Sequence, residues 1–525
     1  MNELTEIGGA VPAIHLSAAV DASLADLIVD EHRIMKRPEY KWTALSVVTL
    51  GSLMVAIDST IVILALPAML QDLHSDLVRM TWVITSYLLI STVLLLSFGR
   101  MADMFGRVRL YNLGFLIFTV GSVLCGLAPN DLFLIAARVL QGAGGAMLNA
   151  NAMAIITEVF PPGERGTAMG FNSITWGAGS VLGPVLGGLI LSLASWRWIF
   201  LVNLPVGLVG MLAAYFLLHD IAPRQQRERF DILGALLFCI GLVGLLFGLL
   251  EGISVGWRSP LIAALLIIGC GALLAFLWRE RHYAYPMLNL RLFSNRVYAF
   301  SVLAAMLQSL AVFAVNFLVI FYLQGVRGYP PLVAALLILP LPLFISLIGP
   351  LGGRWADRIG GAIPATIGLA IQALALILLG LLTPTTPYWQ LALILALMGI
   401  GGSFFWSPNT STTMSAAPRN HLSVASATLN TLRNVGMIFS FAVALDVAAV
   451  SMPPALVASV FLGTVGHLAP AIARAFTSAM DHAFMASALI CLLAIACSLV
   501  RAGKGQSAAG LTGASLQPTA SDRKE

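Results

Sequence analysis

Runs of about twenty apolar residues recur along most of this 525-residue chain. Each run is long enough to cross the ~30 Å hydrocarbon core of a bilayer as a helix, the form in which a segment satisfies its own backbone hydrogen bonds. Only 10% of the residues are charged, against about 25% in soluble globular proteins. The sequence therefore predicts an all-α polytopic membrane protein. We expect fourteen spans, at 44–67, 80–98, 110–129, 132–159, 167–192, 198–218, 232–251, 260–278, 297–323, 331–352, 362–382, 388–414, 423–448 and 482–500.

Lysine and arginine residues are distributed unevenly over this layout. With the N-terminus inside, 22 of the 29 lie on the inner side, five lie on the outer side, and Arg138 and Arg433 lie within spans. Because inner connections carry the excess of positive charge, we expect a plasma-membrane protein with both termini in the cytoplasm. The bias also accounts for the net charge of +5, so a nucleic-acid partner is not needed to explain it.

One eight-residue pattern occurs twice. Gly99–Gly106 reads GRMADMFG, and Gly353–Gly360 reads GRWADRIG, at an offset of 254 residues. Two further matches follow at nearly the same offset: Gly142–Gly145 with Gly399–Gly402, and Asn172 with Asn430. Two homologous halves related by an axis along the membrane normal are typical of transporters that alternate between inward-open and outward-open states.

The repeat divides the chain into five parts. We expect a cytoplasmic N-tail, a first six-helix half, two inserted spans with flanking loops, a second six-helix half and a disordered cytoplasmic C-tail. Their ranges are 1–41, 42–218, 219–296, 297–500 and 501–525. The inserted spans lack a counterpart in either half and are dominated by apolar residues, so we expect them at the periphery, beside the gap between the halves. The stretch 449–481 is expected to be a long outer loop, either irregular throughout or with an interfacial helix within it.

Two charged residues within spans are the candidates for proton coupling. Asp58 lies well inside the first span, where a carboxylate costs about 2.5–3.5 kcal/mol and needs a partner or a water-filled cavity. Arg138 lies in the fourth span, and a buried guanidinium can hold a carboxylate or a substrate. The alternatives are an aspartate that caps a helix kinked near Pro67 and an arginine that snorkels to the outer interface.

A glycine-rich segment occupies the fifth span. Gly179, Gly183 and Gly187 recur every four residues, so another helix can approach that face closely, and Gly188 follows. Pro184 removes a backbone hydrogen bond and is expected to kink the helix. The segment is either a site of close packing or a hinge and seal against leakage, and both can hold together.

The two repeated patterns are predicted to act as a latch. Their glycines (Gly99, Gly106, Gly353 and Gly360) allow a tight turn between spans. Asp103 and Asp357 can each cap a neighbouring helix and favour its dipole. Arg107 and Arg109 can pair across to the other half or contact anionic lipid. The alternative is a plain solvated turn, which would not require the same residues twice.

Several polar residues within spans could line a cavity, although each alone is more often an interhelical hydrogen bond. They are Gln141, Asn149, Asn151, Asn172, Asn316, Asn430 and Arg433. A fixed ion pair or a charge at a helix end is an equal alternative for Arg433. The five cysteines lack metal-site spacing, and the sequence holds no P-loop, zinc motif or plausible catalytic triad. We therefore expect neither an enzyme nor a metal or other cofactor, with a proton gradient as the energy source.

At these residues the chain resembles the major facilitator superfamily, and within it the fourteen-spanner drug:proton antiporters of the EmrB/QacA type. The resemblance covers roughly 42–500. It rests on the repeated pattern, on Arg138–Ala146, on Gly179–Gly188, on the first-span motif Ala56–Pro67 and on Trp196–Gly207. The chain departs from the usual family pattern at Ile63 and Ala150, and it lacks a proline often seen before Gly99.

The resemblance implies a proton-coupled exporter of amphipathic or cationic small molecules, in which protons enter through Asp58 and Arg138 modulates its affinity. We expect it to work as a monomer in contact with membrane lipids. A dedicated exporter of a metabolite or lipid is the alternative within transporters. A non-transporting membrane receptor or scaffold is the alternative of a different class, and it would tolerate loss of Asp58.

Overall fold

The computed structural model describes residues 39–75, 77–220, 230–256, 258–288, 290–451 and 468–512. Over these ranges the chain is helical and forms no strand. Twelve helices within them are long and apolar enough to cross a membrane, and α9 adds a shorter apolar stretch, Ile232–Gly248. The prediction of a polytopic all-α protein is confirmed, because an apolar run long enough for the bilayer also makes a long helix.

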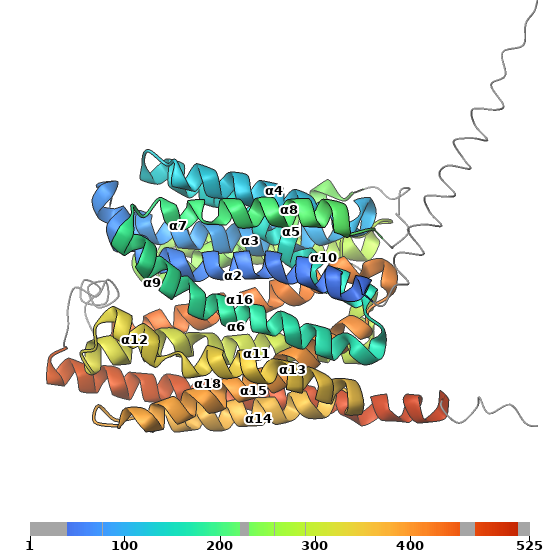
Figure 1. Ribbon diagram of the computed structural model, residues 1–525. Helices are drawn as coiled ribbons and strands as arrows, with labels where there is room; N and C mark the ends of the chain where they lie inside the picture. The colour runs from blue at the N-terminus through green and yellow to red at the C-terminus, as the bar shows by residue number, and fades with distance from the viewer. Residues whose placement is uncertain are drawn as a thin grey trace, which may run out of the picture.

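The first half contains the helices that precede the insertion. They are α2 (Tyr40–Asp72), α3 (Leu77–Phe105), α4 (Arg107–Gly126), α5 (Asp131–Val159), η1 (Pro162–Glu164), α6 (Arg165–Leu193), α7 (Trp198–Leu201) and α8 (Asn203–Leu217). Helix α5 packs on α3 and α4, and α6 packs on α2. In Figure 1 these helices, in blue to green, lie roughly parallel in one bundle.

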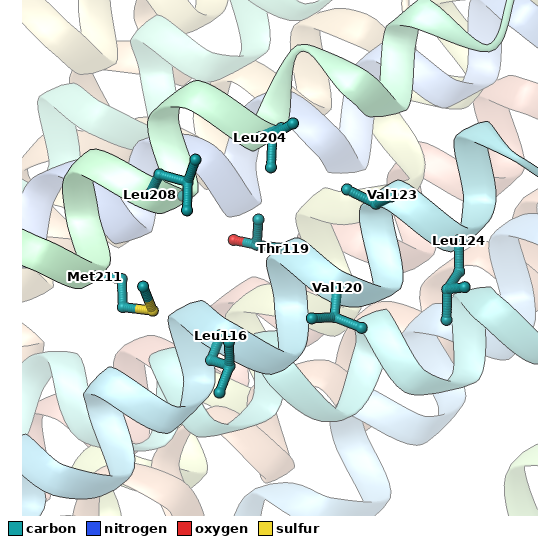
Figure 2. Close-up of a pocket in the computed structure, with 9 residues that line it drawn as sticks. Leu116, Thr119, Val120, Val123, Leu124, Leu204, Leu208 and Met211 are labelled. Carbon is teal, nitrogen blue, oxygen red and sulfur yellow. The ribbon is translucent and has the colours of Figure 1, made fainter.

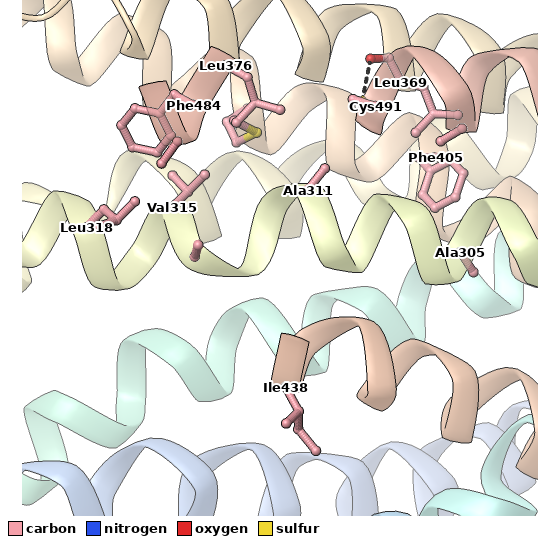
Figure 3. Close-up of a cluster of buried hydrophobic side chains, with 14 of the residues drawn as sticks. Ala305, Ala311, Val315, Leu318, Leu369, Leu376, Phe405, Ile438, Phe484 and Cys491 are labelled. Carbon is pink, nitrogen blue, oxygen red and sulfur yellow. Dashed lines mark hydrogen bonds between the residues drawn. The ribbon is translucent and has the colours of Figure 1, made fainter. Parts of the chain in front are cut away.

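The remaining helices form the insertion and the second half. They are α9 (Ile232–Val255), α10 (Pro260–His282), η2 (Leu290–Ser294), α11 (Arg296–Phe321), the π-helical turn η3 (Tyr322–Val326), α12 (Pro331–Leu337), α13 (Pro340–Ile359), α14 (Ala362–Leu379), α15 (Tyr388–Ser415), η4 (Arg419–His421), α16 (Leu422–Ser451) and α18 (Pro470–Thr512). Figure 3 shows part of their shared apolar core, in which the Cys491 thiol donates to the Leu369 carbonyl at 3.4 Å.

The two halves meet along two seams. Helix α6 packs on α13 along one seam, and α3 packs on α16 along the other; α15 also reaches α6, and α16 also reaches α5. Both ends of the described chain lie at the same end of the bundle, on the right in Figure 1. The repeated patterns also lie there, at the ends of α3 and α13, and we call this the termini end.

The inserted helices lie beside the α3–α16 seam. Helices α9 and α10 pack against each other as a hairpin, and α9 also contacts α3 and α16. The ring of Trp82 on α3 stacks on that of Phe247 on α9, with centroids 5.0 Å apart. Helix α10 leaves Ile267, Leu274 and Trp278 exposed. The hairpin therefore covers one seam from outside.

Two expectations about helix boundaries need correction. The repeated pattern is not a loop, because its residues through Phe105 and Ile359 form the last turns of α3 and α13, and only Gly106 and Gly360 turn the chain. The range 331–352 is broken after Leu337, since Pro340 cannot donate to the carbonyl four residues before it.

The last helix is longer than predicted at both ends. Helix α18 begins at Pro470 rather than at 482, so only part of the predicted outer loop remains, and 452–467 lie outside the described residues. It continues to Thr512, past residue 501, where the predicted disordered tail begins. Residues 1–38 and 513–525 also lie outside the described ranges.

Candidate functional site: a buried ion pair and two helix caps

Asp58 and Arg138 form an ion pair inside the first half. Asp58 lies on α2 with 0% of its surface exposed, and Arg138 lies on α5 with 1% exposed. The Arg138 Nη1 donates to Asp58 Oδ2 at 2.7 Å. The side-chain amides of Gln141 and Asn203 donate to Asp58 Oδ1 at 2.8 and 3.0 Å. The carboxylate thus accepts three hydrogen bonds from α5 and α8.

A second layer holds these donors in place. Arg138 donates through Nε to the Val83 carbonyl at 3.0 Å, and its guanidinium carbon lies 4.2 Å from the ring centroid of Tyr87. Gln141 and Asn203 both donate to the Ser122 hydroxyl, which in turn donates to the Phe200 carbonyl at 2.9 Å. Contributions from α2, α3, α4, α5 and α8 therefore meet at one carboxylate.

This arrangement ties the charge state of Asp58 to the packing of five helices. A buried ion pair is held only while both partners are charged, and removal of one charge leaves the other uncompensated at a cost of about 3–5 kcal/mol. The Asp58–Arg138 pair therefore links the packing of α2 to that of α5, and Asn203 extends this link to α8.

Sequence reasoning missed three members of this site. Asn203 lies within the Trp196–Gly207 segment, so its position was noted although its role was not. Ser122 and Tyr87 carry no signal in the sequence, because serine and tyrosine are common in membrane helices. Only the fold brings them to Asp58.

Asp103 caps a helix of the opposite half. Its carboxylate accepts hydrogen bonds from the backbone N–H groups of Ser423 and Val424, at the start of α16, at 3.1 and 3.0 Å. Arg107 donates to Asp103 Oδ1 through Nε and Nη2, and also to the Arg419 carbonyl at 2.7 Å. Arg107 further pairs with Glu158 at 2.9 Å. The sequence analysis did not single out Glu158.

Asp357 makes the matching contact from the second half to the first. Its Oδ1 accepts from the Gly166 N–H at 2.7 Å, and its Oδ2 accepts from the N–H and hydroxyl of Thr167 at 2.8 and 2.7 Å. Gly166 and Thr167 lie in the first turn of α6. The two aspartates therefore hold the halves together at the termini end, each at a helix N-terminus.

Four glycines shape the termini end: two allow the halves to approach closely, and two allow the chain to turn. A Cβ on Gly99 would lie 2.6 Å from that of Ala427, and one on Gly353 would lie 2.0 Å from the Gly166 carbonyl oxygen. Gly106 and Gly360 have φ values of +112° and +84°, which side-chain-bearing residues rarely adopt.

Asp220 is a further cap that the sequence did not reveal. Its carboxylate accepts from the Val108 N–H at 2.7 Å, in the first turn of α4. A Cβ on Gly106 would lie 2.4 Å from the other Asp220 oxygen, so this glycine also makes room for the cap. Arg109, which was expected to pair or to bind lipid, is exposed.

The glycine-rich segment packs within the first half rather than between the halves. A Cβ on Gly179 would lie 2.4 Å from the Ala56 Cβ, and one on Gly183 would lie 1.9 Å from the Thr60 hydroxyl. These contacts join α6 to α2, the helix of Asp58. A Cβ on Gly188 would meet nothing within 4 Å, and Gly187 is buried on the same helix. The side chain of Pro184 lies outside the described residues.

The predicted cavity residues take different positions. Asn430 donates across the seam to the Asn149 carbonyl at 3.3 Å. Asn151 and Asn172 are buried, and each has one amide oxygen without a hydrogen-bond partner among the described residues. Asn316 is exposed on α11. The guanidinium of Arg433 lies over the rings of Trp176 and Trp406.

At the end of the bundle opposite the termini end, a cluster of three side chains links α2 to the segment that leads into α7. Arg197 Nη1 and Trp196 Nε1 donate to Asp72 Oδ2 at 2.6 and 2.9 Å. These hydrogen bonds, that from Arg197 first, hold the pKa of the Asp72 carboxyl below its usual range. The cluster fixes the end of α2 relative to α7.

A shallow pocket lies between α4 and α8 on the outside of the first half (Figure 2). Thr119 is the one polar residue among the nine that line it, and the rest include Leu116, Val120 and Met211. Without a charged or catalytic group, this pocket does not contribute to the ion-pair site.

The fold and these motifs define a transporter class. The profile of the Major Facilitator Superfamily matches residues 48–233 and 218–441. The chain therefore belongs to the major facilitator superfamily, as its motifs predicted, and is a membrane transporter of that family.

Two relatives with named functions match this chain over about three quarters of its length. The chain is 33% identical over 401 residues to the multidrug resistance protein Stp of Mycobacterium tuberculosis, covering 75% of this chain and 73% of Stp. It is 35% identical over 412 residues to the puromycin resistance protein pur8 of Streptomyces alboniger, covering 75% of this chain and 79% of pur8.

A solved structure supports the fold alone. The proton:xylose symporter XylE aligns with a TM-score of 0.58 at 15% identity, covering 86% of this chain and 95% of that protein.

Proposed function

We propose that this protein is a proton-coupled exporter that carries amphipathic small molecules out of the cell by alternating access. The observation that carries the proposal is the buried Asp58–Arg138 pair, the one described ion pair that lies in the middle of the bundle with both side chains enclosed. Charged groups at membrane depth are costly, and they mark proton relays and substrate paths.

The proposed cycle uses the two ends of the bundle. With Asp58 ionised, Arg138, Gln141 and Asn203 hold α2, α5 and α8 together. A proton that reaches Asp58 removes this attraction and changes the relative free energy of the two access states. The caps at Asp103 and Asp357 favour the state in which the termini end is closed, and they open in the other state.

Export of drugs is supported by the printed functions of the relatives, since Stp and pur8 are resistance proteins. We also propose the fourteen-spanner EmrB/QacA type, with α9 and α10 as the two added spans between six-helix halves. The positive charge at the termini end favours a cell-membrane protein with both termini in the cytoplasm. We further propose that the protein works as a monomer, needs no cofactor and has no enzymatic activity.

Two alternative functions make different predictions for transport. A dedicated exporter of one metabolite or lipid would use the same machinery but would accept a narrow set of substrates. A receptor or scaffold built on this fold would bind ligand without moving it, and would tolerate neutralisation of Asp58. A transport assay with a panel of dyes, drugs and lipids separates all three.

The test is transport in proteoliposomes with an imposed proton gradient, comparing Asp58→Asn with Asp72→Asn. Both variants remove one negative charge from α2, but Asp72 is exposed at its end. We expect Asp58→Asn to lower gradient-driven transport at least about 100-fold, because its proton site is gone, and Asp72→Asn to retain it. Asp58→Asn should still exchange substrate without a gradient. Undiminished gradient-driven transport by Asp58→Asn would contradict the proposal.

A further inference from the structure

Arg433 lies where three helices from the two halves meet. It is on α16, and its guanidinium carbon is 4.9 Å from the ring centroid of Trp406 on α15 and 5.8 Å from that of Trp176 on α6. Helix α6 belongs to the first half, and α15 and α16 belong to the second. Trp406 and Trp176 border two different clusters of buried apolar residues. The cation therefore sits between the halves.

Arg433 also differs from the other enclosed arginines. Its Nε atom is buried without a hydrogen-bond partner, as is that of Arg501. Unlike Arg501, however, Arg433 has no hydrogen-bond acceptor among the described residues, and it takes part in none of the ion pairs that they form. Arg107 and Arg138 each meet a carboxylate. Arg501 donates to four neutral oxygens. Arg433 has aromatic rings beside it and no described acceptor.

Arg433, Trp176 and Trp406 each keep part of their surface accessible, whereas the adjoining Asn430 and Thr431 are buried with 6% and 5% exposed. An enclosed cation that remains partly accessible has its charge available to a molecule that enters between the halves. Transporters built from two repeats bind their substrates at the interface of those repeats.

We infer that Arg433, Trp176 and Trp406 form a binding site for the acidic group and ring of an aromatic or other planar organic anion. The inference rests on the proposed function, because it names the substrate class of the same carrier. It also narrows the sequence-based expectation, which included cationic substrates.

The chemistry of the three side chains supports an anion. Aromatic faces stabilise a guanidinium through its planar surface, and the N–H groups point outward in its plane, where a carboxylate, sulfonate or phosphate can accept two of them. A planar substrate ring can stack on the same tryptophans. A cationic substrate would be repelled by Arg433 and would find no carboxylate there among the described residues.

The test is equilibrium binding to purified protein in nanodiscs of phosphatidylcholine, using 2-naphthoate and 2-naphthylmethylammonium as probes. The two probes share one ring system and differ in the sign of their charge. We expect the wild type to bind the acid at least about tenfold more tightly, the size of one charge-assisted contact. Arg433→Gln should remove that preference, and Arg433→Lys should keep part of it.

Two further variants separate charge recognition from misfolding. Arg474→Gln removes an exposed arginine of α18 and should leave the preference unchanged. Asn430→Asp places a carboxylate three residues before Arg433 on the same helix, so it supplies an internal partner while the arginine remains. It should abolish the preference for the acid even if Arg433→Gln fails to fold.

The outcomes are distinct from those of the proton-coupling test, because binding is measured without a gradient. A wild type that does not prefer the acid overturns the inference, as does an acid preference that survives both Arg433→Gln and Asn430→Asp. If the preference depends on Arg433 but transport ignores the proton gradient, the anion site stands and the proposed coupling fails.

Discussion

The two copies of the repeated pattern make the same contact with different chemistry. Asp103 and Asp357 each accept backbone N–H groups at the start of a helix of the opposite half. Asp103 is also paired with Arg107, which pairs in turn with Glu158. Asp357 has the hydroxyl of Thr167 instead. One cap is thus part of a buried charge network, and the other is an aspartate that meets only neutral donors among the described residues.

The difference shows that the repeat preserves the position of the capping aspartate but does not preserve the charged groups around it. A cap depends on one acceptor placed at a helix N-terminus, which the repeated pattern supplies in both halves. The added charge depends on residues outside the pattern, since Glu158 lies on another helix and Arg107 has Gly361 at the matching position. We therefore expect the Asp103 cap to contribute more to the α3–α16 seam than the Asp357 cap contributes to the α6–α13 seam.

The largest effect is expected for Asp103→Asn. This variant leaves Glu158 as the one carboxylate that pairs with Arg107 among the described residues, and it weakens both bonds to α16. The closed termini end should therefore lose about 3 kcal/mol. Distances between spin labels at positions 109 and 358, one exposed site in each half, report the closed and open populations. A closed population equal to that of the parent protein would show that the charge network does not hold the seam.

A smaller effect is expected for Asp357→Asn. Its amide keeps one acceptor oxygen but loses the charge that favours the N-terminus of α6, which is worth about 1–2 kcal/mol. The same pair of labels gives the shift relative to Asp103→Asn. If Asp357→Asn opened the termini end as far as Asp103→Asn does, the proposed difference in strength between the caps would be wrong.

The smallest effect is expected for Thr167→Val. It removes only the hydroxyl donor to Asp357 and leaves both backbone donors in place, so the loss is that of one hydrogen bond, about 1 kcal/mol. Thr428→Val serves as a control, because that hydroxyl donates to its own helix at Val424 rather than to an aspartate. Equal shifts for the two variants would mean that the Thr167 hydroxyl adds nothing to the cap.

The sequence could predict the helical fold because bilayer thickness and backbone hydrogen bonding allow few solutions. Asp58 and Arg138 could be singled out because a charge within an apolar run is costly. Their pairing could not be predicted, since 80 residues separate them and only helix packing brings them together. Asn203, Ser122 and Glu158 went unnoticed for the same reason.

Helix ends were the least predictable part of the fold. Apolar runs report the lipid-embedded stretch, but the helices continue into polar sequence wherever caps and neighbours allow. Asp103 illustrates this, because it lies in the last turn of α3 and was expected in a loop. Its contact with α16 is tertiary, and no local pattern encodes the partner.

The position of the inserted hairpin makes the two seams of the protein asymmetric in the plane of the membrane. Helix α9 covers the α3–α16 seam, whereas the described parts of α9 and α10 make no comparable packing with α6 or α13, and α13 keeps Leu343, Leu347 and Leu351 exposed. Among the described residues, the hairpin therefore covers one seam from outside, and α13 beside the other seam presents exposed leucines. A solute dissolved in the bilayer leaflet would meet a sheltered flank and an open one, so lateral entry between the halves would favour a single side.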